Sequence, residues 1–187
     1  MEKNTYLCKR NKFNTKIYST MGYTHYWNFS GKVAPKDIER GAEKFARASE
    51  IIKTCLAKVT AKGVKIGDAL GRSLKPIIND TEVLFNGYLD KSCETFYISL
   101  DRGGWDFCKT AREPYDLLVC LSLLAFKYAF GDDFKYTSDG ITKEDYENRE
   151  SNEYWKRTGY VPKGVEQEWQ AAYDMWDEVK AELELTE

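Results

Sequence analysis

The stretch PYDLLVCLSLLAFKYAFG, residues 114–131, decides how this chain folds. Apolar side chains fall on every side of the helix that it would form, and only Ser122 and Lys127 interrupt the run from Leu117 to Phe130. Proline suits the first turn of a helix, and glycine suits the position after its last turn. A helix that is apolar all round is buried, and this one is too short to span a bilayer. We therefore expect it at the centre of a protein core.

Two amphipathic helices and several short strands are predicted around this stretch. Apolar residues recur at steps of three, four or seven over 38–59, after Pro35, and again over 165–183, as in helices with one buried face. Thr142 is positioned to cap a short acidic helix. Asn86-Gly87 between strand-like runs suggests a hairpin with a longer loop. The strands are predicted at 23–29, 81–85, 94–100 and 134–137. These elements predict an α+β fold in which a small, mainly antiparallel sheet packs against the central apolar helix and the amphipathic helices.

The chain divides into a short arm and one domain. Residues 1–20 carry five basic side chains against one acidic side chain and show no apolar period, so we expect a flexible basic arm that is dispensable for folding. No internal repeat or low-complexity linker interrupts residues 21–187. This length is typical of one domain, and we therefore expect a single α+β domain.

The net charge of −2 and the five cysteines argue against several classes of protein. A nearly neutral chain lacks the electrostatic signature of direct nucleic-acid binding. The cysteines are odd in number and form no close pair with one another or with a histidine, which argues against a disulfide framework and against a zinc site. No signal peptide and no membrane-spanning run is visible. We therefore expect a cytoplasmic protein that has no cofactor and no bound metal.

The segment FCKTAREPYD, residues 107–116, is the first candidate for a binding site. It brings together a thiol, an ammonium, a hydroxyl and a guanidinium: Cys108, Lys109, Thr110 and Arg112. A helix N-terminus carries free N–H groups and a partial positive charge, so Lys109 and Arg112 beside it would form an anion site. The alternative is that both pair with surface acids. Cys108 would need a nearby base to act as a nucleophile, and since His25 is the one histidine of the chain, a buried inert thiol is the simpler interpretation.

The strand at 23–29 and the hairpin supply the other candidates. Four strand side chains could stack on a base or contact it: Tyr23, His25, Tyr26 and Trp27. Asn86 can read an amide or a base edge, and Glu94 can accept hydrogen bonds from hydroxyls or amines. The alternatives are a packing role for His25, a turn role for Asn86 and a place on a surface strand for Glu94.

Five segments, in order along residues 21–140, resemble a family of small phage-encoded proteins whose function is uncharacterised. They are MGYTHYWNF at 21–29, FNG at 85–87, ETF at 94–96, FCKTAREPYD at 107–116 and SDG at 138–140. A histidine often precedes ETF in that family, whereas this chain has Cys93, which disfavours a mechanism that needs two histidines. The resemblance implies a viral accessory protein in the cytoplasm of an infected bacterium, and it implies no defined reaction.

Three functions remain open at this stage. The first, by analogy with small phage proteins that sequester immune signals, is anti-defence binding of a small anionic nucleotide-like ligand, without catalysis and with room for a homo-oligomer. Aromatic stacking and a basic pair would supply the contacts. The second is an enzyme that hydrolyses such a signal, with His25 as acid or base aided by Glu94 or Cys108. The third is an inhibitor that binds a host protein through its acidic C-terminal face. We expect the first, a binder rather than an enzyme, because no nucleophile and base occur at motif spacing.

Overall fold

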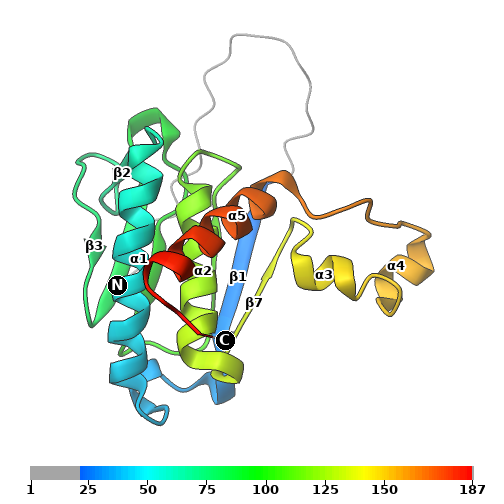
Figure 1. Ribbon diagram of the computed structural model, residues 1–187, viewed down its shortest axis with the longest axis horizontal. Coiled ribbons are helices and arrows are strands. Elements are labelled where there is room, and N and C mark those ends of the chain that lie inside the picture. Colours follow the sequence, from blue (N-terminus) through cyan, green and yellow to red (C-terminus); the bar gives the residue numbers. More distant parts are fainter. Residues whose placement is uncertain (1–21, 187) are drawn as a thin grey trace.

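The computed structural model describes residues 22–186, so the predicted arm at 1–20 lies outside the described residues. Three long helices lie together in the molecule: α1 (Gly41–Ala61), α2 (Asp116–Phe130) and α5 (Gln167–Glu182). Strands cover the side of α2 that α1 and α5 leave open (Figure 1). Helices and antiparallel strands thus share one core, which confirms the predicted α+β class.

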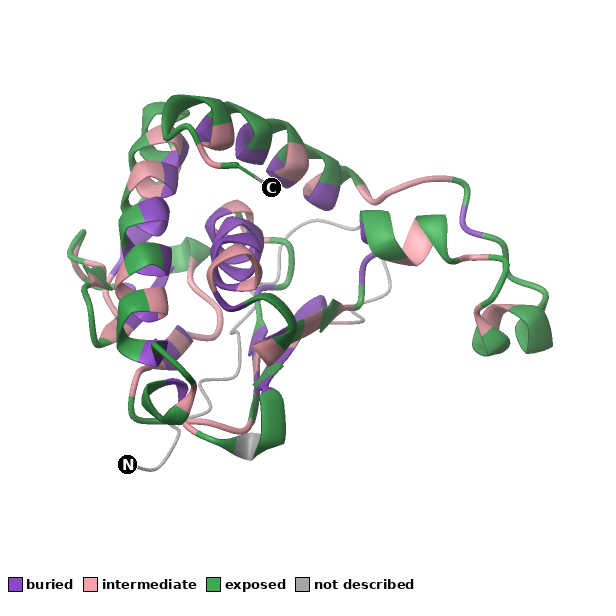
Figure 2. Ribbon diagram, turned by 60° about the horizontal axis from the view of Figure 1, so that its bottom comes forward, coloured by how far each residue is buried: buried purple, intermediate pink, exposed green. Residues whose placement is uncertain are grey.

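Helix α2 is the central element, as the sequence predicted. Eleven of its fifteen residues are buried, and they fall on all sides of the helix. Figure 2 looks nearly along α2 and shows α1, α5 and the strands arranged around it. The helix begins at Asp116, two residues after Pro114, and Gly131 follows its last residue with φ of 58°. A positive φ strains most other residues, so the glycine allows the chain to leave the helix here.

The strands form two small antiparallel sheets instead of the one sheet that was predicted. The first has the order β6-β1-β7, from Trp105–Lys109, Thr24–Phe29 and Phe134–Ser138. The second has the order β2-β4-β3, from Ile66–Gly67, Glu82–Gly87 and Ile77–Ile78, and β5 (Phe96–Ser99) also pairs with β4. The pairing of β4 with β5 confirms the predicted hairpin with its longer loop. Strand β6 was not predicted, because its residues were assigned to the segment that precedes α2.

The period of two along β1 decides which side chains reach the core. Tyr23, just before the strand, and His25, Trp27 and Phe29 within it are all buried. Trp27 packs on Phe96 with ring centroids 5.0 Å apart. Tyr26 and the other even-numbered positions of β1 belong to the opposite face of the sheet. The aromatic face noticed in the sequence is therefore the inner face.

The ends of the helices follow local chemistry. Pro35 begins a 3-10 turn (Pro35–Asp37), and α1 starts only at Gly41, after Arg40 takes a φ of 55°. A Cβ atom at Gly41 would lie 1.7 Å from the carbonyl oxygen of Pro35, so only glycine fits this close approach. Thr142 forms a capping box with Asp145, as predicted for the short acidic helix. The remaining helical segments are α3 (Lys143–Glu147), α4 (Glu153–Thr158) and the 3-10 turns Ser30–Lys32, Leu89–Lys91 and Gly131–Asp133.

Trp169→Ala is expected to lower the free energy of unfolding by about 3–5 kcal/mol, the usual cost of truncating a large buried aromatic. Trp169 on α5 is fully buried, and its ring stacks on Tyr136 and meets the edge of His25. Urea unfolding followed by circular dichroism measures the change. Trp105→Ala is the matched control, because Trp105 is 61% exposed and exposed positions usually change stability by less than about 0.5 kcal/mol. Equal unfolding midpoints for the two variants would contradict the assigned packing of α5.

Candidate functional site

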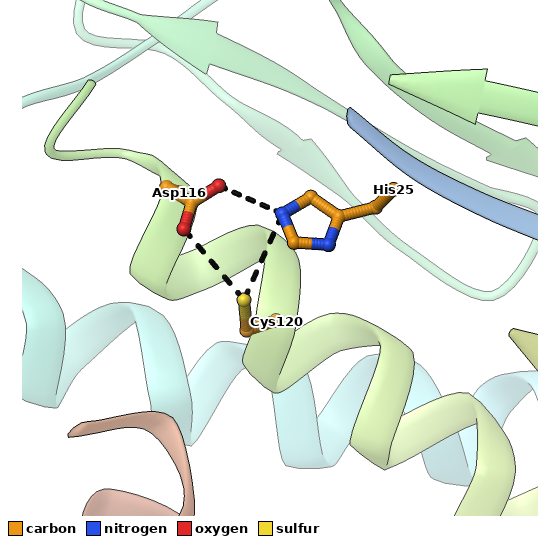
Figure 3. Close-up of side chains that lie close together, drawn as sticks. All are labelled: His25, Asp116 and Cys120. Atoms are coloured by element: carbon orange, nitrogen blue, oxygen red, sulfur yellow. Dashed lines mark hydrogen bonds and ion pairs between the residues drawn. The ribbon is translucent and has the colours of Figure 1, made fainter. Parts of the chain in front are cut away.

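A buried cluster of three side chains joins β1 to α2. His25 points inward from β1, while Asp116 and Cys120 lie one helical turn apart on the same side of α2 (Figure 3). Nε2 of His25 lies 2.8 Å from Oδ1 of Asp116. The Cys120 Sγ atom lies 3.9 Å from the same nitrogen and 3.8 Å from Oδ2 of Asp116. All three residues are buried, so the three polar groups interact with one another away from bulk water.

Neighbouring side chains close over this cluster. The Thr110 hydroxyl donates a short hydrogen bond to Oδ1 of Asp116. The rings of Tyr23 and Trp169 meet the His25 ring edge-on, with centroids 5.1 and 5.6 Å away. The Arg112 guanidinium in turn lies over the Tyr23 ring, 4.0 Å from its centroid. Ligand-sized access to His25 is therefore blocked by aromatic rings.

The geometry of the cluster differs from that of a cysteine–histidine catalytic pair. In such a pair, one ring nitrogen of the histidine contacts the thiol and the other contacts an orienting carboxylate. Here Nε2 of His25 faces both Cys120 and Asp116, and Nδ1 has no hydrogen-bond partner among the residues that the structure describes. Burial, together with the negative charge of Asp116, raises the pKa of the Cys120 thiol well above its ordinary value. The thiolate that nucleophilic attack requires is disfavoured in this position.

Cys108 is likewise a packing residue. Its Sγ–H donates to the carbonyl oxygen of Glu94 at 3.4 Å, and the residue is fully buried. Burial raises the pKa of its thiol, and the charge of Glu94 adds to the effect. Cys108 is the register partner of His25 in the β1–β6 pair. Because its thiol is buried and its pKa is raised, Cys108 fits the inert thiol that the sequence suggested.

Arg112 is held by acids of the protein itself. Its Nε atom lies 3.1 Å from Oε1 of Glu168, and its terminal nitrogen lies 3.5 Å from Oε2 of Glu166. The first turn of α2 already contains the carboxylate of Asp116, and a negative charge there is stabilised by the helix dipole. An anion at this helix end would compete with these three carboxylates. The structure thus contains the alternative that was considered for Arg112, in which it pairs with acids of the protein.

The outer face of the β6-β1-β7 sheet carries a group of three aromatic rings, of which one is exposed and two are half-buried. Trp105 is 61% exposed and stacks on Tyr26, with centroids 5.9 Å apart and planes inclined by 23°. Phe107 completes the group, 5.3 Å from the Trp105 ring. In the register of the sheet, Asn28 of β1 lies between Trp105 of β6 and Lys135 of β7. Two residues along the strands, Phe107 of β6 lies beside Tyr26 of β1. We call Tyr26, Trp105 and Phe107 the aromatic face.

The nine residues predicted as ligand contacts are divided between the inside and the outside of the molecule. Five are buried and contact other parts of the protein: Tyr23, His25, Trp27, Asn86 and Thr110. The Asn86 amide oxygen accepts from the backbone N–H groups of Gly87 and Cys93, so it stabilises the hairpin loop as its turn alternative required. Glu94 accepts from the backbone N–H of Lys109. Tyr26 lies in the aromatic face, whereas the Lys109 side chain is exposed at the end of β6.

The sequence did not reveal the partners of His25 in the buried cluster or the partner of Tyr26 in the aromatic face. Asp116 and Cys120 were treated as parts of the apolar helix, although their spacing of four residues places them on one side of it. Trp105 was not considered, although Trp105, Phe107 and Lys109 alternate with buried residues as a strand does. His25 and Asp116 are 91 residues apart in the chain, so their contact depends on the tertiary fold.

Comparison of the chain with protein-family models, curated proteins and solved structures finds no match. Within residues 22–186, no helix is both long enough and apolar enough to cross a bilayer.

Three thiols, all buried within the part of the chain that the structure describes, are expected to resist alkylation in the folded protein. Burial raises the pKa of Cys55 to about 12, and it also raises the pKa of Cys108 and of Cys120. Thiolates are the reactive form, so a brief pulse of iodoacetamide at pH 8 should leave these residues unmodified until denaturant is added. Peptide mapping by mass spectrometry measures the modification. Rapid alkylation of Cys120 in the folded state would contradict the enclosed cluster.

Proposed function

We propose that this chain binds and sequesters a small anionic ligand that contains a nucleotide-like base, and that the base stacks on the aromatic face. The observation that carries the proposal is the exposed Trp105 ring stacked on Tyr26. Large aromatic surfaces left in contact with water often mark interaction sites. Base–aromatic stacking contributes about 1–3 kcal/mol per base, so a face of this kind suits a flat, delocalised ring.

Two lysines and one asparagine on the same side of the sheet suit the rest of such a ligand, although the Tyr26 hydroxyl also donates to the carboxylate of Asp139. Lys135 belongs to the same row of the sheet as Trp105, two strands away, which corresponds to about 10 Å. Asn28 lies between them in the register, where its amide could pair with a polar base edge. Lys109 is exposed at the other end of β6. A base over Trp105 would therefore have ammonium groups within reach of its phosphates.

Two observations favour binding without catalysis: the residue types on the outer side of the sheet and the burial of His25. Among the described residues, the outward-facing positions of β1, β6 and β7 include no histidine and no cysteine. His25, the acid or base of the enzyme alternative, is fully buried behind Tyr23 and Trp169. A general acid or base must come within hydrogen-bond reach of its substrate. An enzyme at this surface would lack the group that was assigned to proton transfer.

The biological role in this proposal rests on the resemblance to phage-encoded proteins. A phage accessory protein in the bacterial cytoplasm that removes a nucleotide-derived immune signal would need a tight, preorganised surface and no turnover. Inhibition of a host protein through the acidic C-terminal segment is the remaining alternative. The absence of binding to every ligand in the titrations below would favour it.

Trp105→Ala is expected to weaken ligand binding about 5-fold to 150-fold, which corresponds to the loss of one stacking contact. The measurement is isothermal titration calorimetry of the full chain with cyclic dinucleotides, cyclic mononucleotides and ADP-ribose. Tyr154→Ala removes another exposed aromatic side chain, 60% exposed and located on α4, and should leave the affinity unchanged.

Three further measurements separate this proposal from its alternatives: analysis of the ligand released by heating the complex, an assay for products, and titration of an Arg112 variant. A ligand that is released intact on heating fits sequestration, whereas multiple turnover lost in His25→Ala would establish the enzyme. Affinity lost in Arg112→Ala but retained in Trp105→Ala would move the site to the start of α2 and contradict the aromatic face.

A further inference from the structure

We propose that His25, Asp116 and Cys120 bind one zinc ion in the core, between β1 and α2. The donor atoms of these three residues all lie within 4.8 Å of one another. They come from two elements that the fold brings together, as Figure 3 shows. This inference is independent of the ligand proposed for the aromatic face.

The spacing of the donor atoms approaches that of a tetrahedral zinc site. Zinc–nitrogen, zinc–oxygen and zinc–sulfur distances of about 2.0–2.3 Å place tetrahedral ligands about 3.3–3.6 Å apart. The Cys120 Sγ atom lies 3.9 Å from His25 Nε2 and 3.8 Å from Asp116 Oδ2. The 2.8 Å contact between His25 and Asp116 would open by about half an ångström as the metal replaces the shared proton. Small rotations about side-chain bonds suffice for this change.

The set of donors matches the preferences of zinc. Thiolate, imidazole and carboxylate are its usual protein ligands, and three protein ligands commonly leave the fourth position to water. One thiolate and one carboxylate neutralise the charge of the ion, and a site with no net charge is the least costly to bury. Thr110 already donates to Asp116, and hydrogen bonds of this kind orient the carboxylate ligands of metal sites.

Zinc binding changes the protonation of the cluster. Zinc accepts lone pairs from Nε2 of His25, from a carboxylate oxygen of Asp116 and from the sulfur of Cys120. The Cys120 thiol releases its proton to solvent, and the single imidazole proton, which lies between Nε2 and Asp116 in the metal-free cluster, moves to Nδ1. One proton therefore leaves for each zinc ion bound, and no oxidant or reductant takes part.

The bound ion would connect the central helix to the central strand of the first sheet. A ligand that binds only the folded state raises stability, and these two elements belong to distant parts of the sequence. The competing interpretation is a metal-free hydrogen-bonded cluster with a neutral Cys120 thiol. The two interpretations differ in metal content, in the spectrum of a cobalt-substituted protein and in the melting temperature after chelation.

The test uses the full-length protein, purified without chelators and analysed for metals by inductively coupled plasma mass spectrometry. We expect one zinc ion per chain, and a melting temperature that falls when a strong chelator removes it. Replacement by Co²⁺ should produce a thiolate-to-cobalt charge-transfer band in the near ultraviolet. Cys120→Ala should abolish the band and the stoichiometric zinc. Cys55→Ala, which removes a buried cysteine of α1 outside the cluster, should keep both.

Two results would overturn the proposal. One is less than a tenth of an equivalent of zinc in the purified protein and after refolding with excess Zn²⁺. The other is a charge-transfer band that persists in Cys120→Ala. If that variant fails to fold, the wild-type cobalt spectrum decides, because bound cobalt without a thiolate band would exclude Cys120 as a ligand.

Discussion

The contact between His25 and Asp116 links the two elements on which the rest of the structure depends. His25 belongs to β1, the middle strand of its sheet, and Asp116 to α2, which the other long helices surround. A buried polar group that loses its partner costs about 1–3 kcal/mol, and more if it is charged. The pairing therefore disfavours any register that turns His25 outward. With β1 held on α2, the places of β6 and β7 follow from their ladders with β1.

The fixed register gives the two faces of β1 opposite characters. Side chains at odd-numbered positions enter the core, where His25 meets Asp116 and Cys120 in an enclosed polar cluster. Side chains at even-numbered positions belong to the outer face, where Tyr26 and Trp105 stack in contact with water. A one-residue shift would exchange these two sets. Ligand binding and the proposed metal site are thus separate properties of one strand, with the first at the surface and the second in the core.

The sequence was sufficient to predict the elements whose signal is local. The all-apolar α2, the stripe along α5, the hairpin at Asn86-Gly87 and the Thr142 cap depend on neighbours within a few turns, and all four are present. The candidate site was harder to predict because it depends on contacts between distant segments. The inner direction of the aromatic strand face, the role of Asp116 and the pairing of β6 with β1 are set by which surface α2 covers. An aromatic period of two is the same whether that face is buried or open, and this is why Trp27 was assigned to a ligand.

The two faces of β1 can be distinguished directly by nuclear magnetic resonance. In a ¹⁵N-labelled sample titrated with the nucleotide that binds most tightly, the indole N–H signal of Trp105 reports on the outer face and those of Trp27 and Trp169 report on the inner face. The account predicts that the Trp105 signal shifts together with the backbone signals of Tyr26 and Lys135, while the signals of Trp27 and Trp169 stay in place. Shifts confined to Trp27 and Trp169, with Trp105 unchanged, would contradict it.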